Sequence, residues 1–183
     1  IPLPGRVEID GKHLSVYGQN GKKIWETNVL GIITKAQISD LNNDQMPEVI
    51  VGIGESDERV NNPRADCGKL IIFDSMGKIE WDINFSDLPS YAINVGASTG
   101  TVVINNFLVA DLFGDAQKEI VVLSHDLMWY PSKLTLVLAD GTISAEYWHP
   151  GFIYDVKAVQ DKNNHQTLLV ARAVNNDLAT TYN

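Results

Sequence analysis

The chain is poor in cysteine, because Cys67 is the only one among its 183 residues. A single thiol excludes an internal disulfide. We expect Cys67 to be buried or inert, since a reactive cysteine needs an exposed, electropositive setting. The sequence also lacks any run of about 18 apolar residues, which a membrane-spanning helix would require. We therefore expect no membrane insertion.

Positive charge is scarce as well. Lys and Arg number 14 against 23 Asp and Glu, so the formal net charge is −9 and the sequence pI is about 4.8. The negative charge is spread along the chain and is not gathered in one tail. Nucleic acids and anionic membrane surfaces would repel such a protein, so neither is expected as a partner.

A helical period and a catalytic set are also missing. No segment keeps an apolar period of about 3.6 residues, so we expect little helix. Ser124, His125 and Asp126 are adjacent in sequence. Neighbours on a strand point to opposite faces, which argues against a catalytic triad there. An enzyme is therefore not the expected assignment.

One short loop, residues 40–48, is rich in oxygen ligands. Asp40, Asn42, Asp44 and Glu48 stand at its first, third, fifth and ninth positions, and Met46 at the seventh can offer its backbone carbonyl. Calcium takes about six to eight oxygens, several of them anionic, from a tight turn of this kind. The pattern indicates a calcium-binding loop. The alternative is an acidic turn without metal, in which Asp and Asn bond their own backbone.

The loop is not an EF-hand. An EF-hand needs Gly at the sixth position and a bidentate Glu at the twelfth, between two helices. Here those positions hold Gln45 and Val51, and both flanks are rich in β-branched residues. A strand–loop–strand arrangement is therefore predicted.

The same pattern occurs again at residues 111–119. Asp111, Asp115 and Glu119 repeat the first, fifth and ninth positions, whereas Phe113 at the third cannot ligate a metal. This second loop is expected to keep the turn and to bind metal weakly or not at all. A third, more eroded copy begins at Asp161. Recurrence of one pattern along a chain is typical of repeat architectures.

Between these loops, three hydrophobic strands each lead through an Asn/Asp/Gly turn into a second strand that ends near Trp25, Trp81 or Trp148. We expect these tryptophans to pack between sheets. The pattern predicts an all-β fold of propeller blades with four antiparallel strands each. Its expected parts are a half blade at residues 12–28, full blades at 32–84 and 105–149, and a half blade at 153–174.

The two acidic loops resemble the calcium-binding turns of FG-GAP repeats, a β-propeller family found in integrin α-subunits and in many bacterial extracytoplasmic proteins. The resemblance rests on residues 40–52 and 111–122. It implies a calcium-stiffened turn between the first two strands of a blade. The ligands that it implies are Asp40, Asn42, Asp44, the Met46 carbonyl and Glu48. The Phe-Gly…Gly-Ala-Pro signature is absent, and Gln45 stands where the family usually has Gly. The hairpins also resemble those of quinoprotein-type propellers, without cofactor ligands.

The expected strands are too few for a ring. A propeller usually has about four to eight blades, and two full plus two half blades give about three. We therefore expect residues 1–183 to form one domain that is part of a longer propeller or closes its ring with another chain.

The expected function is a non-enzymatic binding or scaffold module with structural Ca²⁺. Its partner would be a protein, a carbohydrate or another part of the same propeller. A periplasmic, cell-surface or secreted location is expected, since calcium is abundant outside the cytosol. Alternatives are a propeller domain of a carbohydrate-active enzyme and the sensor portion of a receptor or kinase. Two long loops, residues 54–68 and 87–101, are candidate binding segments. Within them, Arg59, Arg64 and Tyr91 are the ligand-binding candidates.

Overall fold

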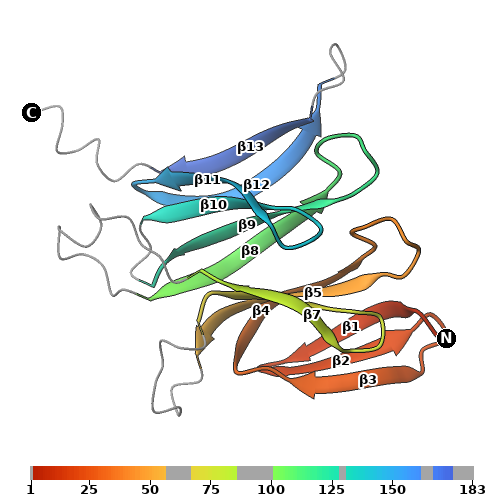
Figure 1. The fold of residues 1–183 in the computed structure, drawn as a ribbon. Coiled ribbons are helices and arrows are strands. Elements are labelled where there is room, and N and C mark those ends of the chain that lie inside the picture. Colours follow the sequence, from red (N-terminus) through yellow and green to blue (C-terminus); the bar gives the residue numbers. More distant parts are fainter. Residues whose placement is uncertain (1, 57–66, 86–100, 128–130, 162–166, 175–183) are drawn as a thin grey trace, which may run out of the picture.

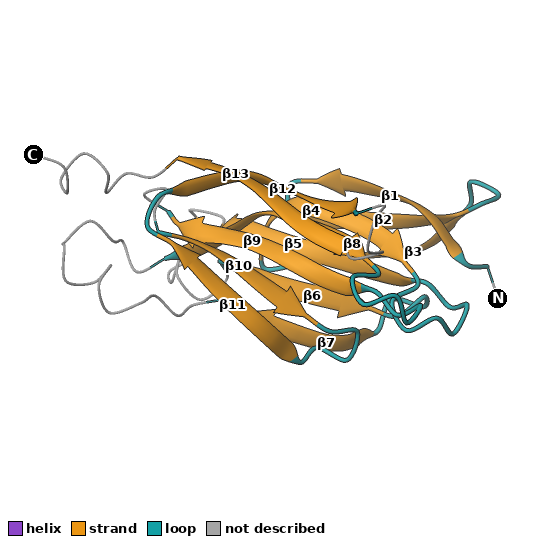
Figure 2. Cartoon of the chain, turned by 90° about the horizontal axis from the view of Figure 1, so that it is seen from above, coloured by secondary structure: helices purple, strands orange, loops and turns teal. Residues whose placement is uncertain are grey.

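The computed structural model describes residues 2–56, 67–85, 101–127, 131–161 and 167–174. Within these ranges it contains strands and connecting turns but no helix (Figure 2). Consequently no described element is a helix that could cross a bilayer. The strands are β1 Pro4–Asp10, β2 His13–Gly18, β3 Lys23–Asn28, β4 Gly31–Ser39, β5 Glu48–Ser56, β6 Lys69–Phe73, β7 Ile79–Asn84, β8 Val102–Ala110, β9 Glu119–Asp126, β10 Ser132–Val137, β11 Ile143–His149, β12 Phe152–Gln160 and β13 Thr167–Val174.

The strands form four antiparallel sheets that follow one another in chain order (Figure 1). The first sheet is β1-β2-β3, the second β4-β5-β6-β7, the third β8-β9-β10-β11 and the fourth β12-β13. The second and third sheets are four-stranded meanders of the kind that builds propeller blades. The predicted all-β class and blade architecture are confirmed.

The first sheet differs from the prediction, because it has three strands where the sequence analysis placed only a hairpin at residues 12–28. The additional strand is β1, which pairs with β2. Val7 and Ile9 lie opposite Val16 and Leu14, on the face that meets the second sheet. Arg6 and Glu8 alternate with them, so the segment has the period of two that a half-buried strand shows. The Pro and Gly residues just before this short stretch hide it as a strand in the sequence.

The core lies between the sheets and not inside any one of them. One apolar cluster fills the space between the first and second sheets, and another fills the space between the second and third. β5 has apolar residues on both faces and contributes to both clusters, as a strand buried on two sides does. Fully buried members of the clusters include Leu14, Val16, Val49 and Val51 in the first, and Ile50, Leu70, Ile72, Ile104, Phe107 and Val122 in the second.

A tryptophan joins each of the first two sheets to a turn of the next one. Trp25 on β3 lies over Gly77, where a Cβ atom would be 2.8 Å from the Trp25 ring, and its indole N–H donates to the Ser75 carbonyl at 3.2 Å. Trp81 on β7 lies over Gly141 in the same way, at 3.0 Å. Both glycines have φ near +87°, a conformation open to glycine at little cost. These two tryptophans pack between sheets as predicted.

Trp148 does not belong to this series. Trp25 and Trp81 each follow a turn glycine by four residues, and the corresponding residue after Gly141 is Ala145. The strand pairing agrees, because Ile72 lies opposite Trp81 and Leu136 lies opposite Ala145. The Trp148 ring instead lies under the Lys133 ammonium at 4.9 Å.

Candidate metal-binding loops

The first acidic loop, residues 40–48, joins β4 to β5. Leu41 anchors it in the core with an exposed fraction of 1%, whereas Asn42, Asp44 and Met46 are exposed. The predicted strand–loop–strand arrangement is confirmed. The loop is therefore anchored by the buried Leu41, and its polar side chains face solvent.

Its side chains fold back onto its own backbone. The two Asp40 carboxylate oxygens accept the N–H groups of Asp44, at 3.1 Å, and Gln45, at 2.9 Å. Asn42 Oδ1 accepts the Asp44 N–H at 2.9 Å, and Asp44 Oδ1 accepts the Met46 N–H at 2.7 Å. Such bonds define an Asx-type turn, and each uses only part of the acceptor capacity of a carboxylate.

Glu48 closes the loop from inside. Its exposed fraction is 3%, and its Oε2 accepts the Leu41 N–H at 2.8 Å. Burial raises the pKa of Glu48 above its ordinary value, and the nearby negative charges of Glu80 and Asp44 raise it further. Burial also raises the pKa of Glu80. A cation among these acids would offset both the burial and the repulsion.

The second acidic loop, residues 111–119, repeats this arrangement. Glu119 Oε2 accepts the Leu112 N–H at 2.8 Å, Asp111 Oδ2 accepts the Ala116 N–H at 3.0 Å, and Asp115 accepts the Gln117 N–H. The third position, Phe113, has an exposed fraction of 60% and adds no ligand. The turn therefore forms from the first, fifth and ninth residues alone. The third copy falls mostly on residues 162–166, outside the described ranges.

The donor set of the first loop suits calcium chemically, with three carboxylates, one amide oxygen and one carbonyl. The arrangement of those donors is less complete. Among the residues that the structure describes, no three or more His, Cys, Asp or Glu side chains lie close enough together to hold a metal ion. A bound cation would have to draw Asp40, Asp44 and Glu48 closer together.

Two loop positions have a left-handed backbone. In the first loop Asn43 has φ of 62° and Gln45 has φ of 70°; in the second, Ala116 at the sixth position has φ of 72°. This conformation costs a residue with a Cβ atom roughly 1–2 kcal/mol. The strain at the sixth position explains physically why a glycine suits it.

We expect Gln45→Gly to raise the free energy of unfolding by about 0.5–1 kcal/mol. It removes the left-handed strain, and the added freedom of glycine in the unfolded chain cancels part of the gain. Urea denaturation of both proteins measures the difference. Gln37→Gly is the control, because Gln37 lies within β4, where glycine only weakens the strand. A Gln45→Gly protein no more stable than the wild type would contradict the prediction.

The two acidic loops touch each other. The Lys118 N–H donates to the Leu41 carbonyl at 2.8 Å, and Lys118 Nζ donates to Ser39 Oγ at 3.0 Å. Lys118 stands at the eighth position of the second loop, where the first has Pro47, which has no N–H. The sequence analysis missed this contact, because no local pattern shows that the loops are neighbours. The second loop therefore buttresses the first.

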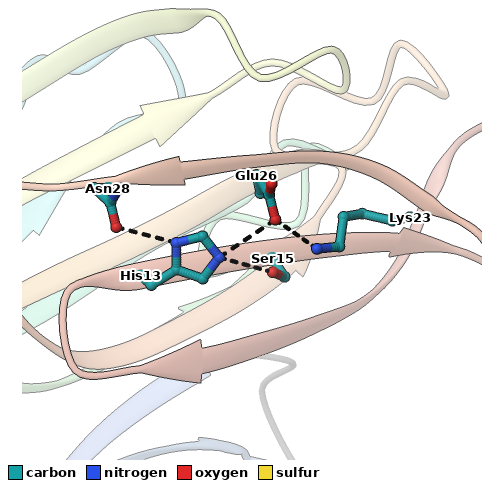
Figure 3. Close-up of polar contacts among 5 residues, drawn as sticks. All are labelled: His13, Ser15, Lys23, Glu26 and Asn28. Atoms are coloured by element: carbon teal, nitrogen blue, oxygen red, sulfur yellow. Dashed lines mark hydrogen bonds and ion pairs between the residues drawn. The ribbon is translucent and has the colours of Figure 1, made fainter.

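A second polar cluster lies on the outward face of the first sheet (Figure 3). His13 Nε2 lies 3.2 Å from Ser15 Oγ and 3.4 Å from a Glu26 oxygen, and His13 Nδ1 lies 3.0 Å from Asn28 Oδ1. Lys23 also bonds Glu26, which lowers the pKa of Glu26 and raises that of Lys23. The sequence analysis did not identify this cluster.

The Ser15–His13 pair resembles a nucleophile beside a base, but it lacks a group to stabilise an oxyanion. Both residues lie inside β2, which pairs with β1 and β3 on its two sides. The backbone N–H groups there serve the sheet, whereas acyl-transfer chemistry needs free N–H donors near the nucleophile. We therefore assign the cluster to the polar surface of the first sheet.

The remaining predicted residues contribute no described site. Arg59, Arg64 and Tyr91 lie outside the described residues. Ser124, His125 and Asp126 are successive residues of β9, and the His125 ring packs edge-on against Phe152. Of the predicted site residues that the structure describes, those of the two acidic loops are the ones that it brings together.

A scan against protein-family models and a search of curated proteins find no match. Solved structures do match in fold. The Dos1 propeller superimposes with a TM-score of 0.52 at 15% identity, over 92% of this chain and 38% of that one. A protein of unknown function from Bacteroides caccae gives 0.42 at 8%, over 93% and 57%. BBS1N in its complex with ARL6DN gives 0.43 at 12%, over 90% and 56%.

The likeness to the Dos1 propeller supports the propeller fold and nothing beyond it. This chain spans less than two thirds of the length of each of these structures.

Proposed function

We propose that this chain is a binding or scaffold module of a β-propeller whose first acidic loop, residues 40–48, holds a structural Ca²⁺ ion. The ligands would be the side-chain oxygens of Asp40, Asn42, Asp44 and Glu48, and the Met46 carbonyl. Calcium would supply positive charge to a turn that otherwise gathers three carboxylates. The buried Glu48 is the observation that carries the proposal, because no cationic side chain in the described part of the chain pairs with its carboxylate.

The proposed binding role rests on the fold and the charge. A stack of sheets with rigid turns offers fixed surfaces, and binding residues commonly lie on the loops of such scaffolds. The net charge of −9 favours a protein or carbohydrate ligand over nucleic acid. A weak calcium site is filled most readily where calcium is abundant, so we place the protein outside the cytosol.

Calcium titration by calorimetry, together with thermal melts, tests the metal site. The wild type should show saturable binding and a melting temperature that rises with calcium. Asp44→Asn removes one charge but keeps an oxygen that can accept the Met46 N–H. We expect this variant to bind calcium more weakly by on the order of tenfold or more, since ligand charge sets affinity in such loops.

Asp115→Asn in the second acidic loop is the matched control. It makes the same charge change at the same loop position and should leave the main binding event unchanged. If the wild type gives neither heat nor a shift in melting temperature, the loop is an acidic turn without metal, and the calcium proposal fails.

A further inference from the structure

A cavity of about 160 Å³ lies between the first and second sheets. Its walls are mainly apolar, and the Lys69–Asp82 ion pair also lines it. Leu30, with an exposed fraction of 72%, and Ile79, at 49%, form an apolar rim. The apolar wall residues that carry the argument are Val29, Ile53, Ile71 and Phe73.

The next interface, between the second and third sheets, shows what fills the corresponding space. Phe85 corresponds to Val29. The Phe85 N–H donates to the Gly68 carbonyl at 2.7 Å, one step beyond the Lys69–Asn84 pair, and the Val29 N–H donates to the Lys12 carbonyl at 3.0 Å, one step beyond the His13–Asn28 pair. Phe85 is fully buried. A phenyl ring thus occupies the space that Val29 leaves open.

Trp148 supplies a second ring at that interface. It lies opposite Lys133 in the third sheet, as Asn84 lies opposite Lys69 in the second. The Lys133 ammonium lies 5.5 Å from the Phe85 ring centre and 4.9 Å from that of Trp148. Val29 and Asn84 thus stand at the two positions where the next interface has Phe85 and Trp148, and of these two Val29 lines the cavity.

Lys69, which lines the cavity, forms the same kind of ion pair as Lys133 at the next interface. Lys133 pairs with Glu146, which lies two residues before Trp148, and Lys69 pairs with Asp82, two residues before Asn84. An ammonium within about 6 Å of a ring centre attracts its face. Lys69 is thus placed to contact a ring that enters the cavity.

We propose that this cavity binds an aromatic side chain of a polypeptide partner. Its volume matches a single ring, since an apolar cavity of about 150 Å³ binds benzene. Phe85 and Trp148 show which side chains fill the same space one interface further along the chain. The exposed Leu30 and Ile79 extend the apolar surface beyond the ring and fit the residues that flank it in a peptide.

Titration of the full chain with a blocked five-residue peptide, Gly-Gly-Phe-Gly-Gly, tests the proposal. Isoleucine methyl groups observed by NMR report the site. Saturable shifts should appear at Ile53, Ile71 and Ile79, and Ile143 at the other interface should not respond. Peptides with Leu or Ala in place of Phe should bind at least tenfold more weakly. Equal binding of the Leu peptide, or no binding of the Phe peptide, overturns the proposal.

A parallel titration with toluene shows whether the cavity takes a free aromatic molecule or the aromatic side chain of a peptide. If toluene binds and the Phe peptide does not, the cavity takes small molecules, and the assignment to a polypeptide is wrong. No calcium is needed in these titrations, so their failure and the failure of the calcium site are separate results.

Val29→Phe should fill the cavity as Phe85 fills its counterpart. We expect it to weaken Phe-peptide binding at least tenfold and to raise the melting temperature. Asn84→Trp, at an exposed position, is a second variant in case the buried change disturbs folding. Ile9→Phe is the control, because it adds a ring to the first sheet outside the cavity. Unchanged binding in both Val29→Phe and Asn84→Trp would overturn the proposal.

Discussion

Replacing Gly68 by Ala should lower the free energy of unfolding by about 3 kcal/mol. Gly68 has φ of 61°, where a Cβ atom costs roughly 1–2 kcal/mol. That atom would also lie 2.5 Å from the Val102 carbonyl oxygen. The obstacle is backbone of the neighbouring sheet and cannot swing aside, and such overpacking typically adds about 1–3 kcal/mol. Thermal melts should show a fall of roughly 6–12 °C, since 1 kcal/mol corresponds to about 2–4 °C at this size.

Gly11→Ala separates the two causes. Gly11 has nearly the same φ, 59°, but a Cβ atom there would meet nothing within 4 Å. Its cost should therefore be the backbone strain alone, about 1 kcal/mol. Equal losses in Gly11→Ala and Gly68→Ala would show that contact with the next sheet is unimportant, contrary to the prediction.

Trp25→Ala should cost about 2–3 kcal/mol. Removing a fully buried Trp or Phe costs about 3–5 kcal/mol, and Trp25 is only half-buried. The change removes the contact with Gly77, the hydrogen bond to Ser75 and the packing on Phe73, whose ring centre is 5.4 Å away. Urea denaturation measures the loss. Tyr147→Ala, with an exposed fraction of 57%, should stay within about 0.5 kcal/mol.

A double-mutant cycle shows whether Trp25 acts through Gly77. Gly77→Ala places a Cβ atom 2.8 Å from the Trp25 ring, so it should cost more in the wild type than in Trp25→Ala. Residues in contact typically couple by about 0.5–3 kcal/mol. Strictly additive losses would mean that the ring yields freely and does not hold the turn.

The strands and acidic loops could be predicted because their signals are local. Apolar and β-branched residues mark β4 to β7, and the repeated Asp and Glu spacing defines two turns with matching hydrogen bonds. The extra strand β1 was missed because it begins with Pro4 and Gly5, which are uncommon in strands. Trp148 was grouped with Trp25 and Trp81, although its spacing from Gly141 differs from theirs and it contacts Lys133 instead of a turn glycine.

Contacts between sheets were beyond the reach of the sequence. The bond from Lys118 to Leu41 joins residues far apart in the chain, and it depends on which sheets become neighbours. The cavity beside Val29 is visible only when two interfaces are superimposed and Phe85 is seen to fill one of them. Local periodicity predicts which residues are buried and does not predict what each one meets.

The Trp–Gly contacts all run the same way, from one sheet to the next sheet along the chain. Trp25 reaches forward from the first sheet and Trp81 from the second, whereas the corresponding residue of the third sheet, Ala145, has no ring that could make such a contact. Structures that bond only to nearest neighbours behave like a one-dimensional zipper, in which each junction has its own strength. The two junctions that hold a Trp–Gly contact are those between the first and second sheets and between the second and third. Local unfolding should therefore begin at β12 and β13 and proceed sheet by sheet towards β1.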